Sequence, residues 1–172
     1  MANAAIVRIA EYHNDVIASL RLYFSDASPS FQERFFGRTP EEISVELAAR
    51  LEETDLRSAL AIFSTVEAAF RVDYEQRCQA RMRDDLSRAF RAMYKERKKK
   101  VGLEEDIFEA WKDEWPGSRQ LIGSLRGAFK FRHWLAHGRY WKPRLARTKY
   151  DFGSVYGLAE DVFNSLPLCE PD

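Results

Sequence analysis

The stretch with the clearest potential for chemistry runs from residue 132 to residue 138 and reads Arg-His-Trp-Leu-Ala-His-Gly. Arginine holds phosphate groups through paired hydrogen bonds, and histidine exchanges protons near neutral pH. Arg132 therefore suits the binding of a phosphate, and His137 suits proton transfer. His133 follows the arginine directly and could orient either group or the substrate. We take these three residues as candidate catalytic residues.

The segment around them, 116–150, contains nine basic side chains and no acidic one. The whole chain has a formal net charge of zero, so the basic side chains are concentrated in part of it. Such a concentration attracts polyanions, and with the arginine and histidines it indicates RNA. The expected RNA contacts are cations and aromatic rings near the catalytic candidates: Arg126, Lys130, Arg139, Tyr140, Trp141 and Lys142.

The elements that must position these residues are helices. Apolar residues recur at steps of three and four, without the alternation of strands, which predicts an all-α protein. We expect an antiparallel helical bundle of four to five main helices. Thr39-Pro40-Glu41-Glu42 begins a helix with a capping box. Asp55 is expected to cap a further long helix. A kink or a break near Arg83–Asp85 is one expectation for a helix of this length, and the sequence does not place it.

The helix that carries the candidates is predicted over 118–137, with Ser118 as its cap and Gly138 just past its end. Its apolar stripe contains Leu121, Leu125, Ala128, Phe129 and Ala136. Arg132 lies on this stripe and needs a polar partner there. Glu67, one turn before Arg71, is a candidate for that role. Arg132 and His137 lie about 140° apart around an ideal helix, so His137 must occupy an unwinding last turn to share a substrate. Asp151 or Ser154 caps the final helix.

The chain of 172 residues is expected to form a single domain, 1–172. Within it, 55–167 forms the core, and 1–54 adds helices as dimer surface or as a lid. Cys78 and Cys169 have no metal-ligand spacing. His133 and His137 have the spacing of a helical metal-binding pair, but no carboxylate follows before Asp151, so metal binding is the weaker reading. We expect no metal and no cofactor. No signal peptide and no apolar run of about 20 residues is found, which predicts a cytoplasmic protein with no membrane contact.

The segment from Phe131 to Gly138 resembles the HEPN superfamily, whose hallmark is an Arg-x4–6-His motif late in a helical bundle. A polar residue after the arginine and the ending Ala-His-Gly also match that pattern. The segment 63–71 looks like the second core helix of the ribonuclease-type members. The resemblance covers roughly 55–167, and it is specific only at the motif.

The resemblance implies a metal-independent endoribonuclease. It implies a homodimer with a composite cleft, in which the ribose 2′-hydroxyl attacks the adjacent phosphate. The products would carry a 2′,3′-cyclic phosphate and a 5′-hydroxyl. It also suggests a toxin or phage-defence effector, with an antitoxin protein as a possible partner. Some HEPN toxins carry a tyrosine two residues after the histidine that such an antitoxin adenylylates; here Tyr140 stands one residue later, which weighs against that modification.

Two alternatives to the ribonuclease stay open. A non-catalytic helical module could use the same basic face to bind RNA or an acidic antitoxin partner. A purely structural dimerisation domain would have no affinity for RNA.

Overall fold

The structure is a computed structural model that describes residues 3–97, 100–139 and 150–169. Within these ranges it contains helices and turns and no strand. The α-helices are α1 (Ala4–Tyr23), α2 (Phe31–Arg34), α3 (Pro40–Gln79), α4 (Asp85–Arg97), α5 (Phe108–Glu114), α6 (Arg119–Ala136) and α7 (Phe152–Ser165). A π-helical turn, Leu103–Ile107, leads into α5, and a 3₁₀ turn, Pro116–Ser118, leads into α6. The predicted all-α bundle is confirmed. None of the described helices is long and apolar enough to cross a membrane.

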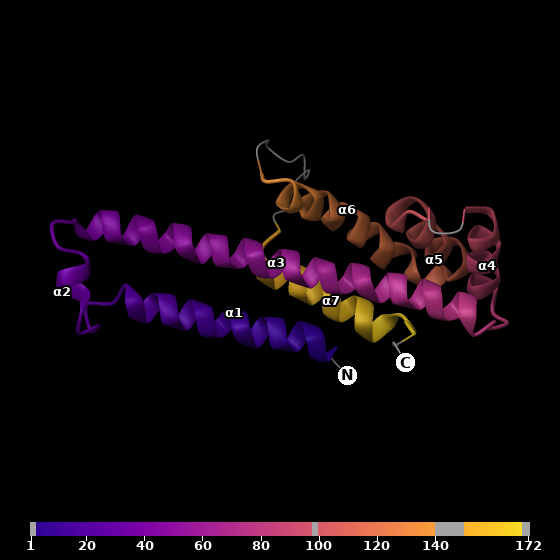
Figure 1. Cartoon of the computed structure of the whole chain (residues 1–172), viewed down its shortest axis with the longest axis horizontal. Coiled ribbons are helices and arrows are strands. Elements are labelled where there is room, and N and C mark those ends of the chain that lie inside the picture. The colour runs from indigo at the N-terminus through magenta and orange to yellow at the C-terminus, as the bar shows by residue number, and fades with distance from the viewer. Residues whose placement is uncertain (1–2, 98–99, 140–149, 170–172) are drawn as a thin grey trace.

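Helix α3 is the axis of the molecule (Figure 1). Its 40 residues span about 60 Å at 1.5 Å per residue. Helix α1 packs along α3, and the short α2 closes the hairpin between them. Helices α6 and α7 also pack on α3, while α4 and α5 gather near its C-terminal end. Every long element therefore contacts α3.

The start of α3 is the predicted capping box. The Thr39 hydroxyl accepts from the Glu42 backbone N–H at 3.2 Å, and the Glu42 carboxylate accepts from the Thr39 N–H at 2.8 Å. The prediction that Asp55 caps a separate helix is wrong, because α3 continues through that residue. No glycine or proline stands between Pro40 and Gly102, so nothing in the backbone forces an interruption at Asp55.

Of the two expectations near Arg83–Asp85, a kink and a break, the structure shows a break. Helix α3 ends at Gln79 and α4 begins at Asp85. The Asp84 carboxylate accepts from the Ser87 backbone N–H at 2.9 Å, which is the bond of a helix N-cap. Arg81 adopts a φ of +52°, in the left-handed region that reverses the chain direction.

Aromatic side chains from α3, α5 and α6 form the centre of the core. The Phe108 ring meets Phe70 at 4.9 Å and Phe129 at 5.4 Å between centroids, and Phe63 meets Phe129 at 5.6 Å. These edge-on pairs add to the free energy gained by burying the rings. In α6 the predicted stripe is buried at Leu125, Ala128 and Phe129, but it ends on Leu135; Ala136 is exposed.

The cap predicted at Ser118 acts on the preceding helix. Ser118 stands at the N-cap position of α6, yet its side chain makes no capping bond to α6. Its hydroxyl donates to the carbonyls of Trp111 and Trp115, both at 2.8 Å. Ser118 therefore satisfies the end of α5, where carbonyl groups lack helical partners.

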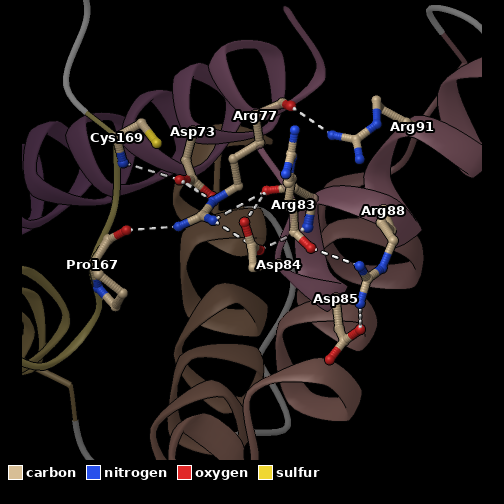
Figure 2. Close-up of polar contacts among 10 residues, drawn as sticks. Asp73, Arg77, Arg83, Asp84, Asp85, Arg88, Arg91, Pro167 and Cys169 are labelled. Carbon is tan, nitrogen blue, oxygen red and sulfur yellow. Dashed lines mark hydrogen bonds and ion pairs between the residues drawn. The ribbon is translucent and has the colours of Figure 1, made fainter. Parts of the chain in front are cut away.

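A buried arginine joins α3, α4 and the segment after α7 (Figure 2). Arg77 is 4% exposed, and its Nε donates to Asp73 Oδ1 at 2.7 Å. Its Nη1 reaches Asp84 Oδ1 at 3.2 Å, and its Nη2 donates to the Pro167 carbonyl at 2.8 Å. Asp73, fully buried, also accepts from the Cys169 N–H at 2.9 Å. A charge taken out of water is tolerated when it is paired and hydrogen-bonded in this way.

Residues 1–54 belong to the same bundle: 40–54 are part of α3, and α1 packs along α3 and contacts α7. His13 of α1 contributes to both contacts. Its ring is 6% exposed and stacks on Phe152 of α7, with centroids 3.8 Å apart. Nδ1 lies 3.1 Å from the Ser58 hydroxyl, and Nε2 lies 3.4 Å from an Asp55 carboxylate oxygen. Burial lowers the pKa of His13, although the Asp55 carboxylate acts in the opposite direction.

Removing the buried cation should destabilise the fold. Arg77→Ala leaves Asp73 buried without its counter-charge, so we expect the free energy of unfolding to fall by about 3–5 kcal/mol. Arg88→Ala is the matched control, because Arg88 pairs with Asp85 on the surface and such pairs contribute at most about 1 kcal/mol. Urea unfolding followed by circular dichroism measures both. Equal, small losses would show that Arg77 does not constrain the bundle.

The lowered pKa of His13 makes stability depend on pH. The unfolded chain binds a proton at the ordinary histidine pKa of about 6.5, while the folded protein binds it only at lower pH. The contribution of the neutral His13 ring to the free energy of unfolding is therefore complete above about pH 6.5. It is lost as the pH falls towards the folded-state pKa of His13. We expect the urea midpoint of the parent to drop more steeply on acidification in this range than that of His13→Gln. Parallel profiles would contradict this assignment.

Candidate active site

The C-terminal end of α6 presents the residues singled out from the sequence. Helix α6 ends at Ala136, His137 is its C-cap, and Gly138 has a φ of +83°. The Arg139 N–H donates to the Trp134 carbonyl at 3.2 Å, which is the long bond of a Schellman motif. The predicted end of the helix at Gly138 is confirmed.

The two histidines lie against each other at this end. The ring centroids of His133 and His137 are 4.2 Å apart, and the ring planes are tilted by 52°. Both residues are exposed. Residues four apart share one helix face, so the regular helix brings His137 to His133. Two imidazoles here can accept or donate protons in contact with solvent.

Arg132 is held by a carboxylate from α3. Its Nη2 donates to Glu67 Oε2 at 2.7 Å, so the predicted contact between the two residues is confirmed. Glu67 Oε1 accepts from Arg71 Nε at 3.0 Å. The Arg132 Nε is buried and meets no hydrogen-bond partner in the described part of the chain. Glu67 thus fixes the direction of the guanidinium group and leaves part of its donor capacity unused.

A pocket of about 190 Å³ opens beside this arginine. Residues from α3, the π-helical turn and α6 line it: Glu67, Arg71, Leu103, Glu104, Glu105, Phe129, Arg132 and His133. His133 thus shares the pocket with Arg132, whereas His137 does not line it and contacts the His133 ring.

Glu104 is a site residue that the sequence analysis missed. It stands in the π-helical turn, 28 positions before Arg132, and no local pattern links the two. Burial raises the pKa of the Glu104 carboxyl, and the neighbouring Glu105 charge raises it further. Arg126, His133 and Arg132 act in the opposite direction. The pocket therefore contains a carboxyl group whose pKa lies above its ordinary value.

Carboxylates from other helices meet the basic segment in space. Three of its arginines are paired in this way: Arg126 with Glu109, Arg132 with Glu67, and Arg139 with Glu53. The Arg139 pair is bidentate, with distances of 2.6 and 3.1 Å. Hydrogen bonds from Arg139 and, to a smaller extent, from Arg57 lower the pKa of Glu53 to about 2.

The remaining RNA-binding candidates are placed differently. Lys130 is exposed on α6, with no ion pair to any residue that the structure describes. Tyr140, Trp141 and Lys142 lie outside the described residues. The local charge of the described site is thus lower than the sequence of 116–150 suggests.

Comparison of the chain with models of protein families, with curated proteins and with solved structures finds no match. In the described ranges, no three His, Cys, Asp or Glu side chains gather as a metal-ion site would require. The resemblance of residues 131–138 to the HEPN motif stays a prediction.

The pKa of Glu104 reports on the charges in the pocket. Glu105→Gln removes a neighbouring negative charge and should lower the Glu104 pKa. Arg132→Ala removes a positive charge and should raise it. Carboxyl chemical shifts from NMR titration of ¹³C-labelled protein measure both changes. If both variants moved the Glu104 pKa in the same direction, or neither moved it, Glu104 would not share the pocket with Arg132.

Proposed function

We propose that the protein is a metal-independent endoribonuclease with Arg132, His133 and His137 as its catalytic residues. One observation supports this above all: the exposed His133 shares a pocket with an arginine that a carboxylate orients, and the His137 ring contacts His133. Oriented charge and proton carriers are what phosphoryl transfer needs from a protein. The resemblance to the HEPN superfamily is the second support.

The chemistry can be written with these groups alone. A histidine takes the proton of the ribose 2′-hydroxyl as that oxygen forms a bond to phosphorus. The bond from phosphorus to the 5′-oxygen breaks, and a protonated histidine gives its proton to that oxygen. The products are a 2′,3′-cyclic phosphate and a 5′-hydroxyl. Arg132 stabilises the charge on the phosphate oxygens through the exposed part of its guanidinium group.

The distance between the histidines favours two chains in one site. In such a displacement the attacking and leaving oxygens lie in line, on opposite sides of phosphorus. The proton acceptor and donor must then flank the phosphate. His133 and His137, with rings 4.2 Å apart, are too close together to do so. We therefore place the second proton carrier on another copy of the chain, in a homodimer with a composite cleft.

A ribonuclease of this kind would damage the RNA of its own cell. We therefore infer a role as a cytoplasmic toxin or phage-defence effector, which an antitoxin protein could restrain by covering the end of α6.

The second candidate is a non-catalytic helical module that binds RNA or a protein. The ion pairs favour it, because Arg126, Arg132 and Arg139 already contact carboxylates. An RNA phosphate would have to displace these partners. Salt-sensitive binding without cleavage would distinguish the module from the enzyme.

The purified protein should cut mixed single-stranded RNA in excess EDTA and leave 2′,3′-cyclic phosphate ends. His137→Ala and Arg132→Ala should reduce cleavage by at least about a hundredfold, the usual size of a lost acid–base or charge-stabilising group. Arg88→Ala, on the distant α4, is the control and should cut like the parent. Glu67→Gln should retain reduced cleavage, because Arg132 remains but loses its charged partner. Cleavage by all variants at the parental rate would refute the assignment.

Mixed dimers test the composite cleft. If the parent and His137→Ala chains are co-refolded in equal amounts, a quarter of the dimers are fully parental. Activity should fall to about one quarter of the parental value if both histidines are needed, and to one half if each chain acts alone.

A further inference from the structure

A second and larger pocket lies between α3 and α4, with a volume of about 620 Å³. It is distinct from the Arg132 pocket, although Arg71 lines both. Its size is that of pockets that hold small organic ligands. Val101 and Ile107, which precede α5, provide apolar wall, and the half-exposed ring of Tyr94 lines it from α4.

Tyr74 brings a weakly satisfied polar group to this pocket. The residue is 7% exposed, and its buried hydroxyl has no nitrogen or oxygen partner in the described part of the chain. The Cys78 thiol beside it is a weak hydrogen-bond acceptor for this hydroxyl, so a ligand atom that accepts more strongly could take its place. Burial raises the pKa of Tyr74 to about 12, and the Cys78 thiol adds to the effect. The hydroxyl therefore stays neutral and can donate to a ligand.

Two cations of α4 face the same space without acidic partners. Arg91 makes one long bond, at 3.4 Å, to the Arg77 carbonyl, and no carboxylate among the described residues pairs with it. Lys95 is exposed and likewise has no ion pair within the described ranges. Glu75 is the acidic side chain among the residues that line the pocket. The electrostatic balance of the pocket favours a negative ligand.

We propose that the pocket between α3 and α4 binds a small aromatic organic anion. Its apolar body lies between Tyr94 and Val101, and its anionic group contacts Arg91 and Lys95. A polar atom of the ligand accepts a hydrogen bond from the Tyr74 hydroxyl. This inference does not depend on cleavage of RNA.

The probe for this site is 8-anilinonaphthalene-1-sulfonate, titrated into the folded full-length protein by calorimetry. We expect saturable binding of one molecule per chain. Arg91→Gln/Lys95→Gln should weaken binding by about tenfold or more, since two charge-assisted contacts are lost. Arg88→Gln/Lys100→Gln removes the same charge from outside the pocket and should bind like the parent. Circular dichroism shows that each variant is folded.

Two further comparisons separate the sulfonate contact from general apolar binding. The uncharged analogue N-phenyl-1-naphthylamine should bind the parent more weakly than the sulfonate. Tyr74→Phe should weaken binding of the sulfonate; if it stabilises the protein and leaves the affinity unchanged, the hydroxyl has no ligand role and the proposed contact is wrong. Equal affinity of both double variants, equal affinity of the two probes, or no saturable binding would overturn the proposal.

Discussion

The arrangement of the bundle depends on one buried charge, that of Arg77. A guanidinium group stays protonated in proteins, so it cannot avoid the cost of burial by losing its charge. It needs Asp73 on α3, Asp84 before α4 and the Pro167 carbonyl after α7 at the same time. The Trp111 ring of α5 covers it, with the guanidinium carbon 5.3 Å from the ring centroid. A packing that removes one of these elements leaves the buried guanidinium group with one partner fewer.

Local signals in the sequence predicted the helical parts well, because caps act over three or four residues. Thr39 and Asp151 both form capping boxes, and Gly138 ends α6. Asp55 also has a side chain that can cap, but neither a proline nor a glutamate supports it as at Thr39, and it lies within α3. Its carboxylate instead lies 3.4 Å from His13 of α1. Such a contact joins positions 42 apart, which no local pattern can reveal.

In the candidate site, too, some contacts could be predicted from the sequence, whereas contacts between distant helices could not. The contact between Arg132 and Glu67 could be predicted as one possibility, because an arginine on an apolar stripe needs a polar partner. The absence of acids from 116–150 was misleading, since Glu53 and Glu109 reach this segment from α3 and α5. Asp73 and Arg77 continue the buried face of Phe63, Val66 and Phe70 along α3. That position was a usable signal for the buried pair, which the charge count alone did not reveal.

Glu67 has two arginines as partners, and the two pockets meet at this group of charges. Arg71 lines both pockets, whereas Arg132 lines only the pocket that also contains His133. A ligand that drew Arg71 away from Glu67 would leave the whole carboxylate charge to Arg132, and Glu67 would then hold the Arg132 guanidinium more firmly. By thermodynamic reciprocity, a ligand that took Arg132 from Glu67 would change the affinity of the first pocket by the same factor. One carboxylate, less than two helical turns of α3 from Tyr74, thus lies where occupancy of the two pockets would be coupled.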